Sequence, residues 1–519
     1  MGRRGLGCLV PLFGAGNSGG KRAYASSSPS PPPSIRAKAR CTLALVAWSC
    51  LLGTGLAAQA DLKARVDALV RPVIESGTAV GLVVGIIDGS RTAIFGYGIL
   101  SPKRPQTPDA RTLFEIGSVT KVFTGVLLAD AVHRGEVALD DPLARFLPPD
   151  VKVPQWEGRG ITLLDLATHT SGLPRLPSNL LPQVAKYPDN PYAHYTVEQM
   201  YQALADVQLQ SRPGTRYQYS NFGMGVLGHA LARRAGKDYE SLVVERICRP
   251  LALDNTRITL SGTQPQRLSP GHDIDGRPLG CWDFPALAGA GALRSTAEDL
   301  VRWLAANLGQ IPTPLRPILD AAQLPRREIG PGQQMALGWH VNTRQSIHWH
   351  NGQTGGYHSY VAFCKKTNTG VVVLSNTAGG IGDVLGMKVL RLLAGEKVEP
   401  PEVRMPIRLP ANKLDRYVGV YEIVPGFSIT VFRREDRLWA QATNQPSLGI
   451  YPASETRFFY RAVKAELEFT IEPDGRIEKL ILHQHGLRLP GWRGGVAGQA
   501  VRKAIQALRR DTGKIAPKP

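Results

Sequence analysis

Cysteine is scarce in this chain, with 6 residues among 519, and only three of them follow residue 60. An odd number without framework spacing does not indicate a disulfide scaffold, so Cys248, Cys281 and Cys364 are expected to be small buried apolar residues. No long apolar run follows residue 56, and no membrane span is therefore expected in the later chain. Basic runs interleaved with aromatic residues are also missing, which argues against a nucleic-acid partner.

Acidic residues are absent from residues 1–60, which hold seven Lys and Arg side chains. The rest of the chain carries 55 basic against 42 acidic residues, and the net charge of the whole chain is +20. A surplus of this sign favours an anionic partner, such as an anionic cell-wall surface. The alternative is a solvated basic surface, which the scattered positions of the basic residues favour. The hydrophobic content of 43% is typical of a globular protein, and the length allows two or three domains.

The start of the chain has the composition of a targeting segment. Residues 1–35 are rich in Gly, Ser and Pro and are expected to form a disordered lead-in. Basic residues then precede the apolar stretch 41–56, and small residues stand at positions 58 and 60. This order predicts a signal peptide at 36–60, cleaved near Ala60, and thus a periplasmic or secreted protein with no stable membrane span after cleavage. The alternative is an uncleaved anchor, although 41–56 is short for a span.

Sequence patterns typical of a helix, a hairpin and a second helix follow the expected cleavage site. Apolar residues recur at helical spacing over 61–76, and two β-rich runs, 81–87 and 92–99, are joined by Asp88-Gly89, which is a strong hairpin signal. An apolar helix follows from Ser118 to about Gly135. Helix, hairpin and helix together predict an α+β fold with helices packed on an antiparallel sheet, in a catalytic domain at 61–397.

The last quarter of the chain has a different composition. Four prolines between positions 400 and 410 exclude a helix or central strand and predict a linker at 398–410. Beyond it, short alternating runs separated by turns predict a small all-β barrel domain at 411–495. A basic tail occupies 496–519.

A serine and a lysine three residues apart open the apolar helix, in the sequence Ser118-Val119-Thr120-Lys121. This spacing places both side chains on one helical face. A lysine whose pKa is lowered by burial can take the proton of the serine hydroxyl, and the serine then becomes a nucleophile. Taken alone, the same pattern also fits a helix cap followed by an exposed lysine.

Tyr219-Ser220-Asn221 offers further residue types that this chemistry needs. A tyrosine beside a lysine ammonium can exist partly as phenolate and pass protons to a leaving group. The Asn221 amide can hydrogen-bond both the lysine and a substrate amide. The alternative is a surface tyrosine followed by a helix-capping asparagine.

His350-Asn351-Gly352-Gln353 follows a short β-rich run. Its glycine is expected to let a substrate lie close against the edge of a strand. The amide of Gln353 is expected to form an oxyanion hole together with the amide of Ser118. The alternative is an ordinary glycine-rich turn between strands.

In this order, the three motifs resemble the signatures of the penicillin-recognising serine hydrolases. The most similar group comprises class C β-lactamases and their relatives: D-alanyl-D-alanine carboxypeptidases, D-aminopeptidases and esterases of the β-lactamase type. Residues 168–174 and 291–300 also resemble stretches of that family, mostly structural ones. The resemblance covers about residues 61–395, and the C-terminal β domain resembles the lipocalin-like extension of some members.

The resemblance implies an exported serine hydrolase that forms an acyl-enzyme on Ser118. It implies β-lactam hydrolysis first, and a D-stereospecific peptidase, DD-carboxypeptidase or esterase next, acting on a β-lactam or a D-amino-acid peptide or ester, without a cofactor. The site residues carried over by position are Ser118, Lys121 and Tyr219 as catalytic, and Asn221, His350, Gly352 and Gln353 as substrate-binding.

One motif departs from the family pattern. Class C β-lactamases usually have Lys-Thr-Gly where His350-Asn351-Gly352 stands here. Because a histidine is only partly charged at pH 7, it is a weaker anchor for a β-lactam carboxylate. This departure argues against efficient β-lactam hydrolysis but not against acyl transfer itself.

Three other readings stay open at this point. A non-catalytic protein that binds penicillin or muropeptides is one, and a scaffold that uses the fold for assembly is another, although a scaffold would not need both Lys121 and Tyr219. The third is a metal site formed by some of four histidines in the later chain. They show no spacing of a recognised zinc site, so no metal is expected; the four are His340, His348, His350 and His358.

Overall fold

The computed structural model describes residues 59–494. The predicted lead-in at 1–35, nearly all of the predicted signal peptide at 36–60 and the predicted basic tail at 496–519 lie outside these residues. Within them, no helix has the length and apolar character needed to cross a lipid bilayer.

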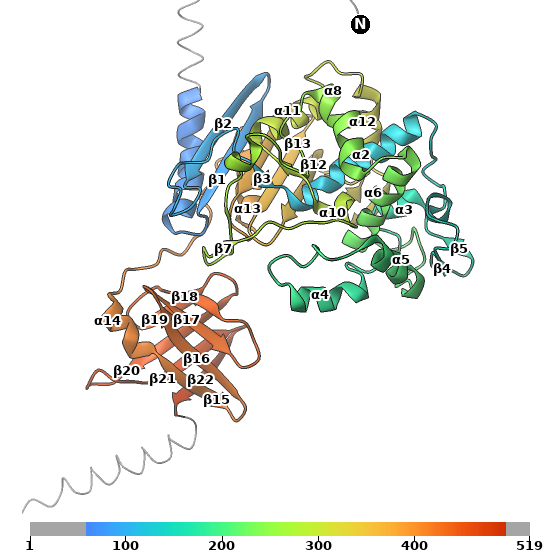
Figure 1. Cartoon of the computed structure of the whole chain (residues 1–519). Helices are drawn as coiled ribbons and strands as arrows, with labels where there is room; N and C mark the ends of the chain where they lie inside the picture. Colours follow the sequence, from blue (N-terminus) through green and yellow to red (C-terminus); the bar gives the residue numbers. More distant parts are fainter. Residues whose placement is uncertain (1–58, 495–519) are drawn as a thin grey trace, which may run out of the picture. The chain divides into compact units, whose positions relative to one another are not determined.

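An antiparallel sheet of eight strands carries the third predicted motif (Figure 1). The strand order is β2-β1-β14-β13-β12-β11-β10-β9. The strands are β1 (Gly81–Asp88), β2 (Arg91–Gly98), β9 (Arg327–Gly330), β10 (Gln333–Met335), β11 (His340–Asn342), β12 (Ile347–Gln353), β13 (His358–Cys364) and β14 (Thr369–Ser375). The predicted hairpin joins β1 to β2, and Gly89 at its turn has a φ of +61°, which glycine adopts without strain.

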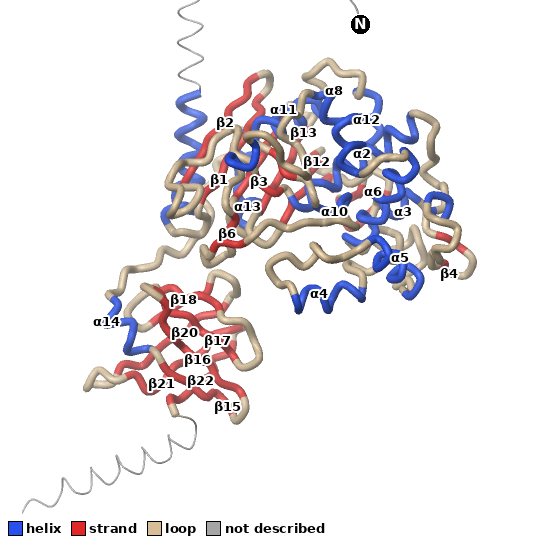
Figure 2. The backbone as a smooth tube through the Cα atoms, viewed as in Figure 1, coloured by secondary structure: helices blue, strands red, loops and turns tan. Residues whose placement is uncertain are grey.

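Helices cover both faces of this sheet, which explains its apolar central strands (Figure 2). The longer helices are α2 (Thr120–His133), α5 (Val197–Asp206), α6 (Asn221–Ala235), α11 (Ala297–Leu308), α12 (Arg316–Gln323) and α13 (Ile381–Leu393), and residues 59–75 are also helical. Val84 of β1 packs with residues of the helix at 59–75 and of α13, whereas Val83 packs with residues of α2 and α11. Successive side chains of a strand point to opposite faces, so a strand covered on both sides is apolar throughout.

Shorter helices and strands lie between β2 and β9 in the sequence. The helices are α3 (Leu163–Ala167), α4 (Leu181–Lys186), α7 (Tyr239–Val243), α8 (Arg249–Leu251), α9 (Gln264–Arg267) and α10 (Ala288–Gly291). The strand pairs are β3 (Phe114–Glu115) with β8 (Arg294–Ser295), β4 (Gln155–Trp156) with β5 (Arg159–Gly160), and β6 (Gly271–His272) with β7 (Pro278–Leu279).

Helix α2 is buried from Thr120 to Ala131, so it forms part of the interior rather than a surface helix. Close backbone packing is possible because Gly125 carries no side chain: a Cβ there would lie 2.0 Å from the carbonyl oxygen of Leu337. Helix α11 begins at a Thr296 cap, whose side chain accepts a hydrogen bond from the Asp299 amide.

The C-terminal strands form a closed barrel of eight strands, with β15 pairing with β22. They are β15 (Gly419–Val424), β16 (Phe427–Arg434), β17 (Arg437–Ala442), β18 (Leu448–Pro452), β19 (Arg457–Tyr460), β20 (Ala465–Ile471), β21 (Ile477–Gln484) and β22 (Leu487–Arg493), and α14 (Ala411–Leu414) precedes them. The rings of Tyr417, Phe458 and Phe469 pack against one another in its core, with centroid distances of 4.8 to 5.4 Å. Residues 396–410 form no helix or strand.

Candidate active site

The structure brings Ser118 and Lys121 into direct contact. Ser118 lies in a 3-10 turn, η1 (Gly117–Val119), that leads into α2, and Nζ of Lys121 lies 2.8 Å from Oγ of Ser118. The same Nζ donates a hydrogen bond to the carbonyl oxygen of Ala290, at 2.7 Å. The lysine side chain is fully buried, which rules out the alternative of an exposed lysine after a helix cap.

Burial lowers the pKa of Lys121 well below its usual value of 10.5, and the charge of Arg175 lowers it further. The cause is that a charged amine loses its hydration in the interior, so the neutral form is favoured. A neutral amine at 2.8 Å can accept the proton of the serine hydroxyl. The pair therefore has the geometry and the electrostatics of a nucleophile with its general base.

The turn before Ser118 is clamped against strand β12. Gly117 has a φ of +47°, and a Cβ there would lie 2.9 Å from the backbone nitrogen of Gln353. A Cβ on Gly352 would lie only 2.0 Å from the carbonyl oxygen of Ile116, which also accepts a hydrogen bond from the Ser359 hydroxyl at 2.7 Å. The sequence predicts that Gly352 makes room for a substrate. In the structure it makes room for the backbone that carries the nucleophile.

Replacing Gly352 by alanine is accordingly expected to displace the Ser118 turn. Overpacking of this kind costs about 1–3 kcal/mol of folding stability. A nucleophile shifted by about 1 Å is expected to lower kcat about 100-fold. Urea unfolding and ester hydrolysis measure the two effects. Gly330→Ala is the control, since Gly330 lies in the same sheet with open space where its Cβ would be. Equal behaviour of the two variants would contradict the clamp.

Tyr219 lies beside this pair, directly before α6. Its ring centroid is 5.0 Å from Nζ of Lys121. Burial raises the pKa of Tyr219 above its usual value of 10, and the Ser118 hydroxyl and the Arg175 charge oppose that rise. The free protein therefore holds Tyr219 as the neutral phenol, and the expected partial phenolate is not what this environment favours. A phenol next to Ser118 can still pass a proton between the lysine side and a leaving group.

Residues 168–175 hold the Tyr219 segment in place. The Ser220 amide donates to Nδ1 of His169 at 3.1 Å, and the Gln218 amide donates to the His169 carbonyl at 2.7 Å. The Ser220 hydroxyl donates to the Pro174 carbonyl at 2.6 Å. His169 has a φ of +56°, so this loop is held in a conformation that non-glycine residues seldom adopt. Residues 168–174, which resemble a structural stretch of the family, thus hold the Tyr219-Ser220-Asn221 motif in place through hydrogen bonds.

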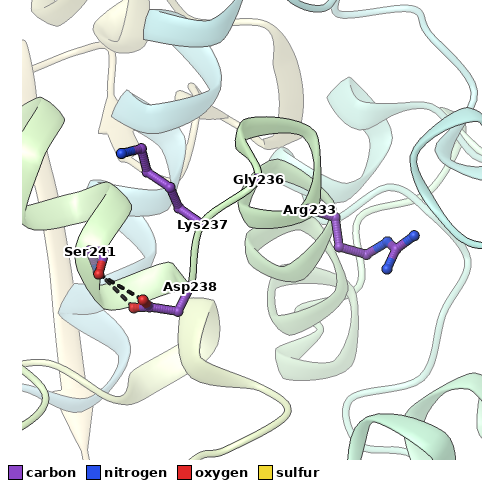
Figure 3. Close-up of a pocket in the computed structure, with 5 residues that line it drawn as sticks. All are labelled: Arg233, Gly236, Lys237, Asp238 and Ser241. Carbon is purple, nitrogen blue, oxygen red and sulfur yellow. Dashed lines mark hydrogen bonds between the residues drawn. The ribbon is translucent and has the colours of Figure 1, made fainter.

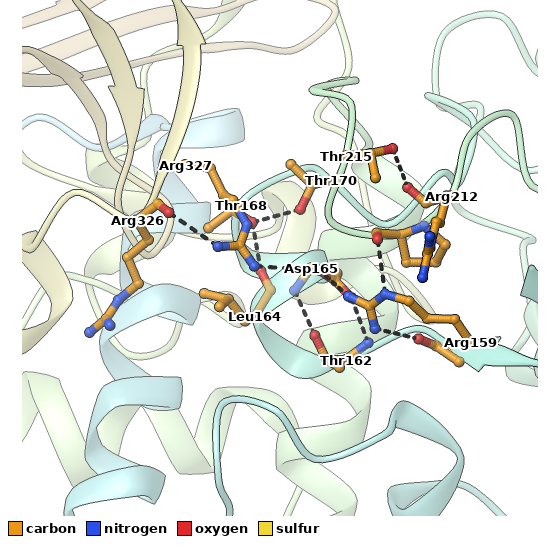
Figure 4. Close-up of polar contacts among 12 residues, drawn as sticks. Arg159, Thr162, Leu164, Asp165, Thr168, Thr170, Arg212, Thr215, Arg326 and Arg327 are labelled. Atoms are coloured by element: carbon orange, nitrogen blue, oxygen red, sulfur yellow. Dashed lines mark hydrogen bonds and ion pairs between the residues drawn. The ribbon is translucent and has the colours of Figure 1, made fainter.

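The buried carboxylate of Asp165 anchors α3, the short helix directly before residues 168–175 (Figure 4). Asp165 has no solvent exposure and forms a capping box with Thr162 at the first turn of α3. Its oxygens lie 3.1 Å from Arg159 and 4.0 Å from Arg327, which come from β5 and β9. A carboxylate that is buried needs such partners, because an unpaired buried charge is strongly unfavourable.

His350 is fully buried and lies near Tyr219, with a centroid distance of 6.2 Å. Burial lowers the pKa of His350 well below 6.5, and the neighbouring His340 and Lys121 lower it further. No described residue forms a hydrogen bond with its Nε2. The imidazole is therefore neutral at pH 7, and even the partial charge expected of it is missing.

The outer part of β12 offers a free edge for a substrate. Strand β11 pairs only with residues 347–349, so within the described chain residues 350–353 have no strand on that side. Both polar atoms of the Gln353 side chain are already hydrogen-bonded within the protein: Nε2 donates to the Thr354 carbonyl at 2.8 Å, and Oε1 accepts from the Gly379 amide at 3.1 Å. The backbone nitrogen next to Gly117 is the part of Gln353 that suits an oxyanion hole.

Asn221 is the first residue of α6, but its side chain does not reach Lys121 in the way that the sequence predicts. The second partner of the lysine is the Ala290 carbonyl instead. Within the described chain, Oδ1 of Asn221 has no hydrogen-bond partner, which leaves it available for a substrate amide.

The four histidines named above as possible metal ligands do not converge. His340 and His350 are neighbours, with a centroid distance of 5.1 Å. His348 stacks on Phe363, and His358 faces Asp383 at 3.4 Å. In the part of the chain that the structure describes, no group of three or more His, Cys, Asp or Glu residues is arranged to hold a metal ion.

A hollow of about 600 Å³ lies at the turn between α6 and α7 (Figure 3). Its lining residues are Arg233, Gly236, Lys237, Asp238 and Ser241. Asp238 there is already used as the cap of α7, accepting from the amide and the hydroxyl of Ser241. None of the residues predicted for catalysis or substrate binding lines this hollow.

The fold and the serine–lysine pair define a known class of structure. A solved structure described as a class C beta-lactamase aligns with a TM-score of 0.58 and 22% sequence identity, over 65% of this chain and 98% of that chain. At this identity the likeness shows the fold. The profile of the family described as Beta-lactamase matches residues 66–396, and the chain therefore belongs to the beta-lactamase family.

Similar proteins fall under more than one activity. The D-alanyl-D-alanine-carboxypeptidase/endopeptidase AmpH of Escherichia coli (strain K12) is 31% identical over 347 residues, covering 62% of this chain and 88% of AmpH. A beta-lactamase of the same organism is 30% identical over 374 residues, covering 65% of this chain and 93% of the relative. Residues 403–490 match a domain of unknown function (DUF3471). The likeness of the barrel to a lipocalin stays a prediction.

Proposed function

We propose that the chain is an exported hydrolase that cleaves D-configured amides through an acyl-enzyme on Ser118. The observation that carries the proposal is the 2.8 Å contact between Ser118 and a buried Lys121 whose pKa is lowered by its surroundings. A peptide ending in D-alanine is the first candidate substrate, because the third motif lacks the lysine that is usual in class C β-lactamases. The identity to AmpH supports this choice.

Class C-like β-lactamase activity is the second candidate. It is supported by the 30% identity to a beta-lactamase and by the shared fold. Both candidates use the same steps, and esterase activity on simple esters is expected with either. The predicted export, with a periplasmic or secreted location and contact with an anionic cell wall, belongs to the proposal as well.

In the proposed reaction, Oγ of Ser118 attacks the carbonyl carbon of the substrate while its proton moves to Nζ of Lys121. The backbone amides of Ser118 and Gln353 stabilise the oxyanion. The bond to the leaving amine then breaks, and the amine receives a proton through the Tyr219 hydroxyl. Water next attacks the acyl ester and gives a proton to the Lys121 and Tyr219 pair. The pair returns this proton to Oγ of Ser118 as the ester bond breaks, which releases the acid and restores the serine hydroxyl.

The test uses the full chain and a Ser118→Ala variant. The substrates are an acylated peptide ending in D-Ala-D-Ala, its L-Ala-L-Ala counterpart, a chromogenic cephalosporin and a p-nitrophenyl ester. Wild type is expected to cleave the D-peptide and the ester and to show a transient acyl adduct by intact mass. Ser118→Ala is expected to form no adduct and to lose at least about 10³-fold in kcat.

Other outcomes would decide against the proposal. A stable adduct without turnover would identify a penicillin- or muropeptide-binding protein without hydrolase activity. No reaction with any substrate would favour a scaffold. Cleavage of the cephalosporin but not of the D-peptide would make β-lactam hydrolysis the main activity.

A further inference from the structure

The neutral His350 leaves open which group recognises a negatively charged substrate. A D-Ala-D-Ala peptide and a β-lactam both carry a carboxylate, and a carboxylate is bound best by a cation. Lys121 cannot serve, because its amine is fully buried and already in contact with Ser118 and Ala290. The cation must come from a residue that is exposed and close to the nucleophile.

Arg175 meets both conditions. Its side chain is exposed, and its Cζ lies 5.1 Å from the centroid of the Tyr219 ring. Nζ of Lys121 lies 5.0 Å from the same ring. The guanidinium and the catalytic pair are therefore neighbours of one tyrosine.

The backbone of Arg175 is held rigidly at this place. Its carbonyl oxygen accepts hydrogen bonds from the amides of Asn221 at 3.0 Å and Phe222 at 3.2 Å, at the first turn of α6. The preceding Pro174 is bound by the hydroxyl of Ser220. Only the side chain of Arg175 is left to adapt, so the entropy lost on binding a ligand is limited to that side chain.

The guanidinium of Arg175 forms no ion pair with any described residue. Arg294 and Arg159, by contrast, are paired with buried acidic residues: Arg294 contacts Glu115 at 3.3 Å, and Arg159 contacts Asp165 at 3.1 Å. A planar guanidinium without an acidic partner presents donors in the geometry that matches a carboxylate. Asn221, which also has an unused oxygen, follows the same loop.

We propose that Arg175 binds the carboxylate of the substrate, and that the chain prefers acyl donors that carry a carboxylate close to the scissile bond. This inference rests on the proposed function and adds the residue that determines charge specificity. The carboxylate accepts two hydrogen bonds from the guanidinium while the carbonyl carbon lies at Oγ of Ser118. Arg175 then takes the role that a lysine holds at the third motif in class C β-lactamases.

Arg175 also acts on the catalytic pair, since its charge lowers the pKa of Lys121. A loss of activity in a single assay would therefore not separate the two effects. Matched substrates do so, because the effect on Lys121 is common to charged and neutral substrates. The measured quantity is the ratio of kcat/KM between the charged and the neutral member of a pair.

Two pairs place the carboxylate on either side of the scissile bond. The first is the mono-p-nitrophenyl ester of glutaric acid with p-nitrophenyl valerate. The second is the acylated D-Ala-D-Ala peptide with its C-terminal amide. In the full chain, Arg175→Gln is expected to lower the ratio at least about 10-fold in one pair, mainly through KM. Arg175→Lys is expected to keep part of the preference, because it retains the charge but not the bidentate geometry.

Arg216→Gln is the matched control, because Arg216 is also exposed and lies three residues before Tyr219. It is expected to leave both ratios unchanged. The proposal is overturned if wild type treats both members of each pair alike, if Arg175→Gln lowers both members equally, or if Arg216→Gln has the same effect. Failure of the proposed function looks different: Ser118→Ala would then hydrolyse the neutral ester as fast as wild type does.

Discussion

Replacing Lys121 by methionine is expected to lower kcat for ester hydrolysis about 10³-fold, within the range that general-base catalysis supplies. Methionine has a similar volume and fits the fully buried site, but it has no amine to accept the proton of Ser118. Stability is expected to hold or to rise, because the interior no longer contains an amine that must lose its hydration. Steady-state kinetics and thermal unfolding on one preparation measure both.

Lys237→Met is the control for this experiment. Lys237 is an exposed lysine that pairs with Glu245 at 2.7 Å, and the loss of such a pair costs at most about 1 kcal/mol. The kcat of Lys237→Met is expected to stay at the wild-type value. If Lys121→Met keeps its activity, the base would have to be Tyr219. If it unfolds, the amine would have a structural role that its hydrogen bond to the Ala290 carbonyl would explain.

Acidification from pH 6.5 to pH 4 is expected to destabilise the protein steeply, because three neutral histidines surround Tyr219. Burial is the main cause that lowers the pKa of His169, His340 and His350 below 6.5, and it lowers that of His340 to about 4. In this window the unfolded chain binds protons that the folded chain does not bind. The free energy of unfolding therefore falls as the pH falls, by up to about 1.4 kcal/mol per pH unit for each histidine.

Urea unfolding at pH 7, 6 and 5 measures this slope. His340→Phe is expected to make the slope shallower by up to about 1.4 kcal/mol per pH unit, since a phenylalanine takes up no proton. The ring contact with Trp349, at a centroid distance of 4.5 Å, can be kept by phenylalanine. His133→Gln, at the exposed end of α2, is the control and is expected to leave the slope unchanged. A slope that is the same in all three proteins would contradict the prediction.

The sequence predicts the fold well where the signal is local. The β1–β2 hairpin and α2 follow from turn residues and apolar spacing, and both are found. Ser118 and Lys121 meet because residues three apart share a helical face, which needs no tertiary information. The strands β9 to β11 are absent from the prediction, because segments of three or four residues have too little alternation to be recognised.

The rest of the site depends on contacts that sequence spacing does not contain. The Ala290 carbonyl reaches Lys121 from a position 169 residues away, and it is a backbone group without a side-chain signature. Arg175 and His169 lie beside Tyr219, but they belong to a loop whose sequence carries no catalytic signature. The protonation states of Tyr219, His350 and Lys121 depend on burial, which sequence spacing does not reveal. The sequence identifies Gly352 as important, but the structure shows that it accommodates the backbone of Ile116.

The burial of α2 on all sides has a consequence for how the protein loses its activity. A helix at the surface can fray while the remainder stays folded, but α2 lies in the main apolar cluster from Val122 to Ala131. Its amide hydrogens are expected to exchange with solvent deuterium only when the whole unit opens. Because Ser118 leads into this helix, hydrolysis rate and deuterium uptake at α2 should report one and the same event. Enzymatic activity would then serve as a direct count of intact molecules.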